Sequence, residues 1–186
     1  LSLALALDSR WLRLRQFFRT AFFLPMTLSM VVAAVIFQLV YAGDIGLLAK
    51  LLAPFGVNVP ALLRDPSTAP YALVAMRVWR TTGYYAIIYL AGLQAISSDL
   101  KEAARLDGAS EIQVVRHVVL PGLKPVALFC IVLSTVSGLE MFDEPMILTQ
   151  GGPGDSTLTV VMFVYQQGFQ FLQLGYAAAA SYVLTM

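Results

Sequence analysis

Apolar stretches long enough to cross a bilayer alternate with polar segments along this chain. Residues 21–41 contain no charged side chain. As a helix rising about 1.5 Å per residue they would extend about 30 Å, the thickness of a hydrocarbon core. Two further apolar stretches cover residues 71–96 and 125–142, and another begins at residue 174. We therefore predict an all-α membrane protein with spans at about 21–41, 71–96 and 125–142, and a partial span at 174–186.

The polar segments differ from one another in composition. The first, 43–70, holds several helix-interrupting residues: Pro54, Gly56, Pro60, Pro66 and Pro70. We predict a loop there, with a short helix at Leu47–Leu52 lying at the membrane interface. Residues 149–173 form a second predicted loop, which contains GGPGDST at 151–157. The segment 98–122 is different, because it is charged and dotted with alanine although it lies between two spans.

Composition supports a membrane protein and excludes several other classes. Of the 186 residues, 59% are apolar and 12% are charged, and the mean hydropathy is +0.76. Soluble domains have about 45–50% apolar and about 25% charged residues. The net charge of +1 offers no basic surface for nucleic acid, and the single cysteine, Cys130, excludes a disulfide framework and a Cys/His metal cluster. The chain begins without methionine and stops inside an apolar run, so we expect a fragment truncated at both ends.

The distribution of lysine and arginine predicts which segments face the cytoplasm, because short cytoplasmic loops are enriched in these residues. Four precede the first span: Arg10, Arg13, Arg15 and Arg19. Four more lie between the second and third spans: Lys101, Arg105, Arg116 and Lys124. The other two loops contain only Lys50 and Arg64. We therefore place the N-terminal arm and the segment 98–122 in the cytoplasm, and the loops 43–70 and 149–173 outside.

Local signals predict two short helices within the charged segment. Asp99 followed by Glu102 has the spacing of a capping box and would start the first helix near Leu100. Gly108 can end that helix in a left-handed conformation. Ser110 can cap a second helix, which Pro121 would end. The pair would project into the cytoplasm and present small side chains to which another protein could approach closely.

This segment resembles the EAA signature of permease subunits of bacterial ABC importers. In EAARLDGASEIQVVRHVVLP the matching residues are Glu102, Ala103, Ala104, Gly108, Val118, Leu120 and Pro121, with Val118 in place of the usual isoleucine. The flanking segments YLAGLQAISSDL, FDEPMILTQGGPGDST and GYAAAAS are similar to the sugar-importer branch, and within it to subunits of the MalF and UgpA kind. The resemblance extends from about Phe18 to the last residue.

The resemblance implies a fold, a location and a set of partners. The chain would be a single domain, 1–186, with the polytopic helical fold of type I ABC importer permeases, in the bacterial inner membrane. Its partners would be a second permease subunit, two cytoplasmic ATP-binding subunits and an extracytoplasmic solute-binding protein. No G-x-x-x-x-G-K-[ST] motif occurs, so ATP and Mg²⁺ would bind to the ATPase and this chain would be neither an enzyme nor a cofactor protein.

The coupling role falls on the residues of the signature. In the family, the EAA helices dock on the ATPase and transmit its closure to the spanning helices. The residues carried over to this role are Glu102, Ala103, Ala104, Asp107, Gly108, Leu120 and Pro121.

Polar residues inside the second and third spans are candidates for the translocation path, because intramembrane charges are costly and mark functional sites. The candidates are Arg77, Arg80, Tyr84, Ser134 and Glu140. Together they offer hydrogen-bonding groups and an aromatic face, which suit a sugar. The alternative is structural: the two arginines mark the outer interface and snorkel, or pair with Glu140. A proton relay is disfavoured because Glu140, Asp143 and Glu144 sit at the end of a span, and we interpret Asp143 and Glu144 as a solvated helix end.

Two further interpretations concern the outer side and the transported solute. Gly151, Gly152 and Pro153 form a tight turn that would contact the solute-binding protein, or would only reverse the chain. The solute would be a sugar or oligosaccharide, although two arginines also suit glycerol-3-phosphate or a related anion. The alternatives of another class are an ion-coupled secondary transporter, which leaves the EAA signature unexplained, and a membrane scaffold, which leaves Arg77 and Arg80 unexplained.

Overall fold

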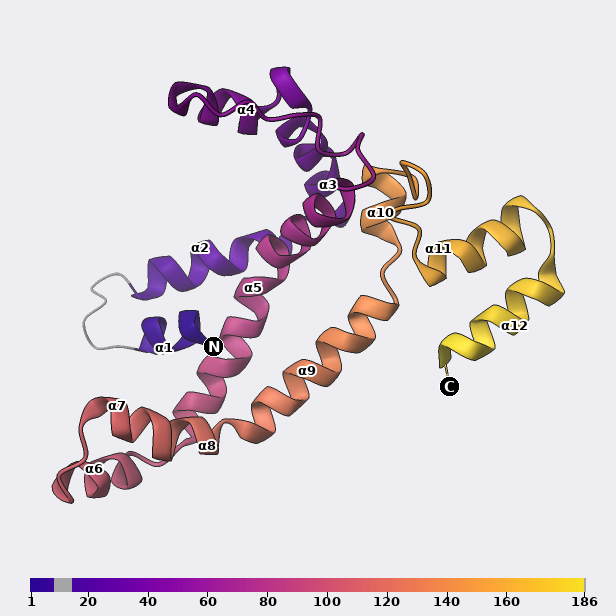
Figure 1. The fold of residues 1–186 in the computed structure, drawn as a ribbon. Helices are drawn as coiled ribbons and strands as arrows, with labels where there is room; N and C mark the ends of the chain where they lie inside the picture. Colours follow the sequence, from indigo (N-terminus) through magenta and orange to yellow (C-terminus); the bar gives the residue numbers. More distant parts are fainter. Residues whose placement is uncertain (9–14, 186) are drawn as a thin grey trace. The chain divides into compact units, whose positions relative to one another are not determined.

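The computed structural model describes residues 1–8 and 15–185, and all regular elements in that part of the chain are helical (Figure 1). The α-helices are α1 (Ser2–Asp8), α2 (Arg15–Thr27), α3 (Met30–Val40), α4 (Leu47–Leu52), α5 (Ala69–Ala95), α6 (Ser98–Leu106), α7 (Glu111–Val114), α8 (Leu120–Gly122), α9 (Lys124–Leu139), α10 (Asp143–Leu148), α11 (Val160–Tyr165) and α12 (Leu174–Thr185). Short 3₁₀ turns lie at Gly43–Ile45 and Ala53–Phe55, and π turns at Val115–Val119 and Gln166–Gln170. The predicted all-α class is confirmed. Arg10 and Arg13, used above for orientation, lie outside the described residues.

The chain divides into two compact units, each built from two separate segments. The first unit comprises Leu1–Thr27 and Thr81–Thr135, and the second comprises Leu28–Arg80 and Val136–Met186. Helices α5 and α9 therefore each contribute residues to both units. The predicted cytoplasmic segment belongs to the first unit and both predicted outer loops belong to the second.

The predicted continuous helix at 21–41 is interrupted in the structure. Helix α2 ends at Thr27 and α3 begins at Met30. The Thr27 hydroxyl donates a hydrogen bond to the Leu24 carbonyl at 2.8 Å, which is the carbonyl that residue 28 would use to extend the helix. Hydroxyl side chains compete with the backbone in this way, and Pro25 has already removed one helical donor nearby. Composition alone did not reveal this break.

The other predicted spans correspond to helices with modest shifts at their ends. Helix α5 matches the predicted second span, α9 ends three residues before the predicted third span does, and α12 occupies the fourth. Among the described residues, no single helix meets the length and hydropathy criteria of a membrane span. Two pairs of consecutive helices meet them jointly: Gln16–Thr27 with Met30–Val40, and Glu111–Gly122 with Lys124–Leu139.

The predicted loop at 149–173 contains a helix that sequence analysis missed. Helix α11 begins after Thr159, whose hydroxyl accepts a hydrogen bond from the Met162 amide at 3.3 Å. An N-cap threonine followed by the apolar run VVMFVY is a helix signal, but the glycines before it and the glutamines after it favoured a loop. The predicted short helix in the other loop, Leu47–Leu52, is confirmed as α4.

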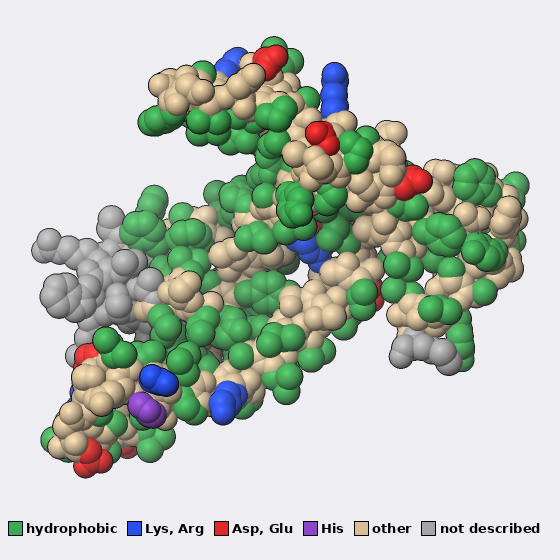
Figure 2. Space-filling view, in the orientation of Figure 1, with side chains coloured by type: hydrophobic (Ala, Val, Ile, Leu, Met, Phe, Trp, Pro, Cys, Tyr) green, Lys and Arg blue, Asp and Glu red, His purple; other side chains and the backbone are tan. Residues whose placement is uncertain are grey.

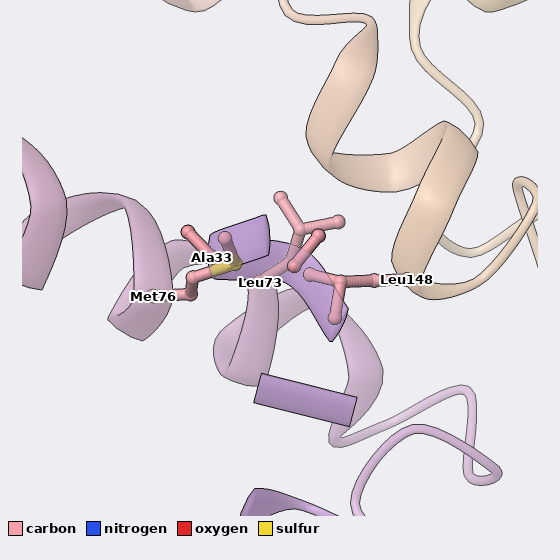
Figure 3. Close-up of a cluster of buried hydrophobic side chains, with 5 residues drawn as sticks. Ala33, Leu73, Met76 and Leu148 are labelled. Carbon is pink, nitrogen blue, oxygen red and sulfur yellow. The ribbon is translucent and has the colours of Figure 1, made fainter. Parts of the chain in front are cut away.

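The core of the second unit lies where α3, α5 and α10 meet. Ala33, Leu73, Met76 and Leu148 are buried there and their side chains converge (Figure 3). Two hydrogen bonds join these helices: the Tyr41 hydroxyl donates to the Ala72 carbonyl at 3.1 Å, and the Gln38 amide donates to the Ile147 carbonyl at 2.6 Å. Small residues on α3 let the helices approach closely, as is common in membrane bundles.

The first unit is held by close backbone packing and a small apolar cluster. Helix α2 crosses α5 at Gly83, where a Cβ atom would lie 1.8 Å from the Phe22 carbonyl oxygen. Only glycine permits this crossing. At the other end of the unit, Ala4, Leu93, Val119 and Leu123 are buried together. This second cluster forms the base of the charged segment.

Candidate functional site

The charged segment folds into an elbow formed by α6 and α7, and its first helix starts two residues earlier than predicted. Helix α6 begins at Ser98 and its N-cap is Ser97, whose hydroxyl accepts a hydrogen bond from the Asp99 amide at 3.1 Å. Asp99 is therefore not the cap. It lies in the first turn instead, where its negative charge is favourable beside the N-terminal end of the helix dipole.

The corner of the elbow depends on Gly108. This residue has φ +85°, a left-handed conformation that glycine adopts without a side-chain clash. The Ala109 amide donates to the Ala104 carbonyl and the Gly108 amide donates to the Arg105 carbonyl, both at 3.0 Å. These two bonds are the Schellman pattern that closes a helix C-terminus, so the predicted helix end at Gly108 is confirmed.

The second helix starts as predicted and continues further. Ser110 and Gln113 form a reciprocal capping box, with hydrogen bonds of 3.4 Å and 2.7 Å. The predicted stop at Pro121 is wrong, because the helical path extends through a π turn and α8 to Gly122. The wider π turn lies just before Pro121, where an α-helix would need the amide hydrogen that proline lacks.

An ion pair that was not predicted joins the two arms of the elbow. Arg105 Nε lies 2.7 Å from Glu111 Oε1, and Arg105 Nη2 lies 3.1 Å from Glu111 Oε2. Hydrogen bonding to Arg105 lowers the pKa of the Glu111 carboxyl, and the same bond raises the pKa of Arg105. Both side chains are exposed, so the pair orients the corner more than it stabilises the fold.

The surface of the elbow combines small and apolar side chains. Glu102, Ala103 and Asp107 are exposed and Ala104 is half-buried. Leu106 is 89% exposed and Ile112 is 80% exposed, which is unusual for large apolar residues on a charged helix pair. A hollow of about 350 Å³ opens between the arms and is lined by Ala104, Asp107, Gly108, Ala109, Gln113, His117 and Val118. This open, partly apolar surface suits a protein partner.

The base of the elbow is packed against α5 and α1, and it leads directly into α9. Val119 and Leu123 contact Leu93 in the buried cluster, and Lys101 Nζ donates to the Leu93 carbonyl at 3.4 Å. A Cβ atom on Gly92 would lie 2.8 Å from Val126 Cγ2, so the two helices run in close contact beside the elbow. A displacement of the elbow would therefore be passed to both helices. Leu120 and Pro121, carried over from the signature, lie exposed along the second arm.

Arg77, a predicted path residue, is bound by protein groups in the second unit. Its Nη1 lies 2.9 Å from Glu144 Oε1, and its Nη2 donates to the Ser137 carbonyl and to Ser137 Oγ, the latter at 2.7 Å. The side chains of Arg77 and Glu144 are only 18% and 9% exposed. The interpretation of Glu144 as a solvated helix end is therefore wrong. Glu144 lies four residues before the buried Leu148, so both lie on the apolar face of α10. This spacing is the sequence signal that could have revealed the burial of Glu144.

The other two path candidates of the second unit have different surroundings. Arg80 is half-buried, and its Nε is buried without a hydrogen-bond partner among the described residues. Glu140 is exposed, and no ion pair joins it to either arginine in the described part of the chain. Arg80 is thus a half-buried cation that the described residues do not neutralise.

Two path candidates belong to the first unit. Tyr84 is half-buried and its ring packs against Tyr85 at 5.4 Å. Ser134 is exposed and lines a hollow of about 180 Å³ together with Tyr85, Tyr89, Cys130 and Ile131. Tyr85 and Tyr89, which sequence analysis did not select, lie one helical turn apart. They give this hollow an aromatic wall beside a hydroxyl group.

The GGP segment forms a tight turn, as expected. The Gly152 amide donates to the Thr149 carbonyl at 3.0 Å, and the buried Thr157 donates its hydroxyl to the Gly152 carbonyl at 2.9 Å. The exposed tip is at Gly154 and Asp155, just beyond Gly151, Gly152 and Pro153. Within the second unit, the two predicted outer loops meet around a hollow of about 770 Å³, whose polar lining includes Gln38, Asn58, Arg64, Thr149 and Gln150. Among the described residues, no group of three His, Cys, Asp or Glu side chains is placed to hold a metal ion.

Comparison with known proteins places this arrangement in a family. The chain is 39% identical over 170 residues to the probable ABC transporter permease protein YurN of Bacillus subtilis, covering 90% of this chain and 58% of that protein. It is 35% identical over 186 residues to the arabinooligosaccharides transport system permease protein AraP of the same organism, covering 99% and 59%. It thus spans under two thirds of the length of these relatives.

A solved structure shows the same fold. The crystal structure of a bacterial ABC transporter involved in the import of the acidic polysaccharide alginate matches with a TM-score of 0.89 at 24% identity, covering 98% of this chain and 64% of that one. The family model described as binding-protein-dependent transport system inner membrane component matches residues 1–186. The whole chain therefore belongs to the family of inner membrane components of binding-protein-dependent transport systems.

Proposed function

We propose that this chain forms half of the translocation pathway of an ATP-driven, binding-protein-dependent importer of sugars or oligosaccharides. A second permease subunit would complete the pathway, two cytoplasmic subunits would hydrolyse ATP, and an extracytoplasmic protein would deliver the solute. The elbow of α6 and α7 would be the site where the ATPase docks.

The observation that carries the proposal is the construction of the elbow. Its outer surface exposes Ala103, Leu106 and Ile112 around an open hollow, whereas its base is buried against α5 and leads directly into α9. Exposed apolar groups with a polar rim are typical of a protein interface. A rigid base is required if the docked partner is to move the spanning helices.

The coupling follows from differential binding. ATP binding can change the permease only if the closed ATPase prefers one permease conformation. The elbow suits this role because its capping box and Schellman turn hold both arms in one geometry. A flexible loop would absorb the movement of the ATPase, whereas this elbow would pass it to Leu93 and Leu123.

The proposed solute class is supported by the relatives and by the side chains that line the hollow beside Ser134. AraP is named for arabinooligosaccharides, and this chain matches it over nearly its whole length. Tyr85, Tyr89 and Ser134 combine aromatic faces with a hydroxyl group, which suits a sugar ring. On the outer side, the hollow between the predicted loops and the turn at Gly151–Pro153 offer polar contacts for a solute-binding protein.

Cysteine crosslinking in the assembled importer tests the docking site. In a Cys130→Ala background, Ala103→Cys should crosslink to the ATPase subunit, and the yield should change when ATP binds. Asn58→Cys, an exposed position in the predicted outer loop, is the matched control and should not react with the ATPase. An actively transporting complex in which Ala103→Cys does not crosslink, or in which Asn58→Cys does, contradicts the proposal.

A second candidate solute is an anionic sugar derivative, and Arg80 favours it. Arg77 is neutralised by Glu144, but the half-buried Arg80 has no ion-pair partner among the described residues. An unpaired cation in an apolar span is expensive, and a carboxylate or phosphate on the solute would satisfy it. Arg80→Gln should then abolish ATP-dependent uptake of an acidic oligosaccharide and spare uptake of a neutral one. Equal uptake of the acidic solute by wild type and variant would reject this candidate.

A further inference from the structure

Residues 43–57, which include α4, carry large apolar side chains that no other described segment covers. Ile45 is 78% exposed, Leu51 is 61% exposed and Phe55 is 79% exposed. Leu47 and Val57 are also exposed. Water is an unfavourable surrounding for so much apolar surface in so short a segment.

The position of this segment is fixed by the residues around it. Gly43 turns the chain away from α3 with φ +64°, and a Cβ atom there would lie 3.2 Å from Ala61 Cβ. The hydrogen bond from Tyr41 to the Ala72 carbonyl holds the end of α3 beside the start of α5. Tyr71, which is exposed at that level, is a residue type that gathers at membrane–water interfaces. The segment therefore leaves α3 at the level where the bilayer surface is expected.

The segment carries large apolar side chains on one side. Leu47, Leu51 and Phe55 follow one another at a spacing of four residues, so they share one side of the helical path. Figure 1 shows α4 beside the C-terminal end of α3. In Figure 2, hydrophobic atoms run along the lower edge of this segment, the side on which α3 continues, while charged atoms lie along its upper edge. This is the orientation of a helix that lies in a lipid interface.

We propose that residues 43–57 form a membrane-surface arm whose apolar edge is buried in the headgroup region of the bilayer. Helix α3, which precedes the arm, also exposes large apolar side chains, among them Val32, Val35 and Leu39, and the same bilayer would cover them. The exposed Lys50 lies one turn from Leu47, where its stem can follow the apolar surface and its ammonium can reach lipid phosphates.

A bilayer explains the exposed side chains better than the solute-binding protein does. A binding protein docks and leaves in each cycle, and its departure would return Ile45 and Phe55 to water. Lipid covers the edge permanently. The arm would also anchor Gly43 and Ala61, so it would hold the outer loop at a fixed depth. This inference depends on membership in a membrane family and not on the transported solute.

Fluorescence quenching in lipid tests the arm. The full-length protein, assembled with its partner subunits, is reconstituted in nanodiscs of phosphatidylethanolamine and phosphatidylglycerol. Leu51→Cys and, separately, Phe55→Cys are labelled with an environment-sensitive fluorophore in a Cys130→Ala background. Asn58→Cys in the same loop is the matched control. We expect blue-shifted emission at positions 51 and 55, and loss of that emission when the acyl chains are brominated, with neither effect at position 58.

Each of the other outcomes overturns the arm. If emission at positions 51 and 55 responds to brominated lipid no more than emission at position 58 does, the edge is in water. Emission that changes only when the solute-binding protein is added assigns the surface to that protein, and crosslinks from position 51 to the second permease assign it to an interface between subunits. Quenching by lipid does not require transport, so failure of the arm is distinguishable from failure of the proposed importer function.

Discussion

Arg77 shows how a single intramembrane charge can be interpreted in two ways. As part of the sequence it is an isolated arginine in an apolar stretch, and a sugar-binding role is reasonable. In the structure its guanidinium contacts Glu144 and Ser137, and both members of the ion pair are largely buried. Arg77 therefore joins α5 to α10 and to the end of α9. This is the structural alternative given in the sequence analysis, in which the arginine pairs with an acid. The acid is Glu144, four residues from the expected Glu140.

Replacing Glu144 should destabilise the protein strongly. Glu144→Gln leaves the buried Arg77 charge without a counter-charge, and losing one partner of a buried pair lowers the free energy of unfolding by about 3–5 kcal/mol. The double variant Arg77→Met/Glu144→Leu should recover most of that loss, because neither charge remains. Thermal unfolding of the purified full-length protein measures both. Glu140→Gln at the exposed position is the control, and a loss equal to that of Glu144→Gln would contradict the pairing.

The Arg105–Glu111 pair should stabilise the elbow in a pH-dependent way. Because the folded pKa of Glu111 is lowered from its usual 4.5, the stabilisation is fully present above that value. It is lost as the pH falls through the depressed pKa. The hydrogen bond to Glu111 raises the pKa of Arg105, so its own titration lies far above neutral pH. The difference in melting temperature between wild type and Glu111→Gln should be small at neutral pH and vanish in acid.

The partner variant tests whether this pH dependence belongs to the pair. Arg105→Gln should reproduce the melting-temperature difference of Glu111→Gln at each pH. The double variant should lose no more than either single variant does. A double variant that loses clearly more would show that the two residues act independently.

Individual helices in this chain meet through small residues, since lipid removes most of the hydrophobic drive for helices to associate. The crossing of α2 and α5 at Gly83 is the closest contact of this kind among the described glycines. Gly92 on the same helix faces Val126, but there the nearest atoms are the ends of side chains. Gly138 and Gly175 have no neighbour within 4 Å of an added Cβ. Glycine is thus required at some helical positions and incidental at others.

Alanine substitutions at these glycines should change the stability of the protein to different degrees. Gly83→Ala places a Cβ 1.8 Å from a backbone oxygen of α2, so the two helices must separate, and we expect severe loss of folded protein. Gly92→Ala should be milder, because Val126 can rotate. Gly138→Ala should be neutral or stabilising, since alanine is favoured over glycine in a helix by about 0.5–1 kcal/mol. Yield and melting temperature of the full-length protein measure the order, and equal effects at positions 83 and 138 would contradict it.

Signals that act within a few residues were the ones that sequence analysis interpreted well. The helix at Leu47–Leu52, the left-handed Gly108 and the cap at Ser110 depend on neighbours along the chain, and all three are confirmed. The break after Thr27 also has a local cause, but a hydroxyl hydrogen bond to the backbone leaves no trace in hydropathy. The α11 helix was missed because flanking glycines and glutamines outweighed its cap.

Contacts between distant segments could not be predicted in the same way. Glu144 meets Arg77 only because α10 folds back against α3 and α5 after α9 has ended. The pattern of charges gave three acids to choose from at that end of the span: Glu140, Asp143 and Glu144. Likewise, the role of Tyr85 and Tyr89 beside Ser134 follows from the packing of α5 on α9, and no motif in the sequence marks those two tyrosines.

At the scale of the whole molecule, the proposed ATPase-docking elbow and the predicted outer loops belong to different units. The first unit contains the elbow and the cluster beneath it, whereas the second contains both outer loops and the hollow between them. Helices α5 and α9 contribute to both units. The chain also passes from one unit to the other between α2 and α3. An effect of a docked ATPase that starts at the cluster of Leu93, Val119 and Leu123 would travel along α5 and α9, because Leu93 lies in α5 and Leu123 directly precedes α9.

Weakening that entry point should separate docking from transport. Leu123 is almost fully buried, and Leu123→Ala should leave a cavity that destabilises the base by about 2–5 kcal/mol. The surface of the elbow is unchanged, so Ala103→Cys should still crosslink to the ATPase. ATP-driven uptake should nevertheless fall, because the cavity absorbs part of the movement. Leu128→Ala, at an exposed position on helix α9, which begins directly after Leu123, is the control and should transport normally. Uptake that remains normal in Leu123→Ala, with crosslinking intact, would mean that the force reaches α5 and α9 by a route other than this cluster.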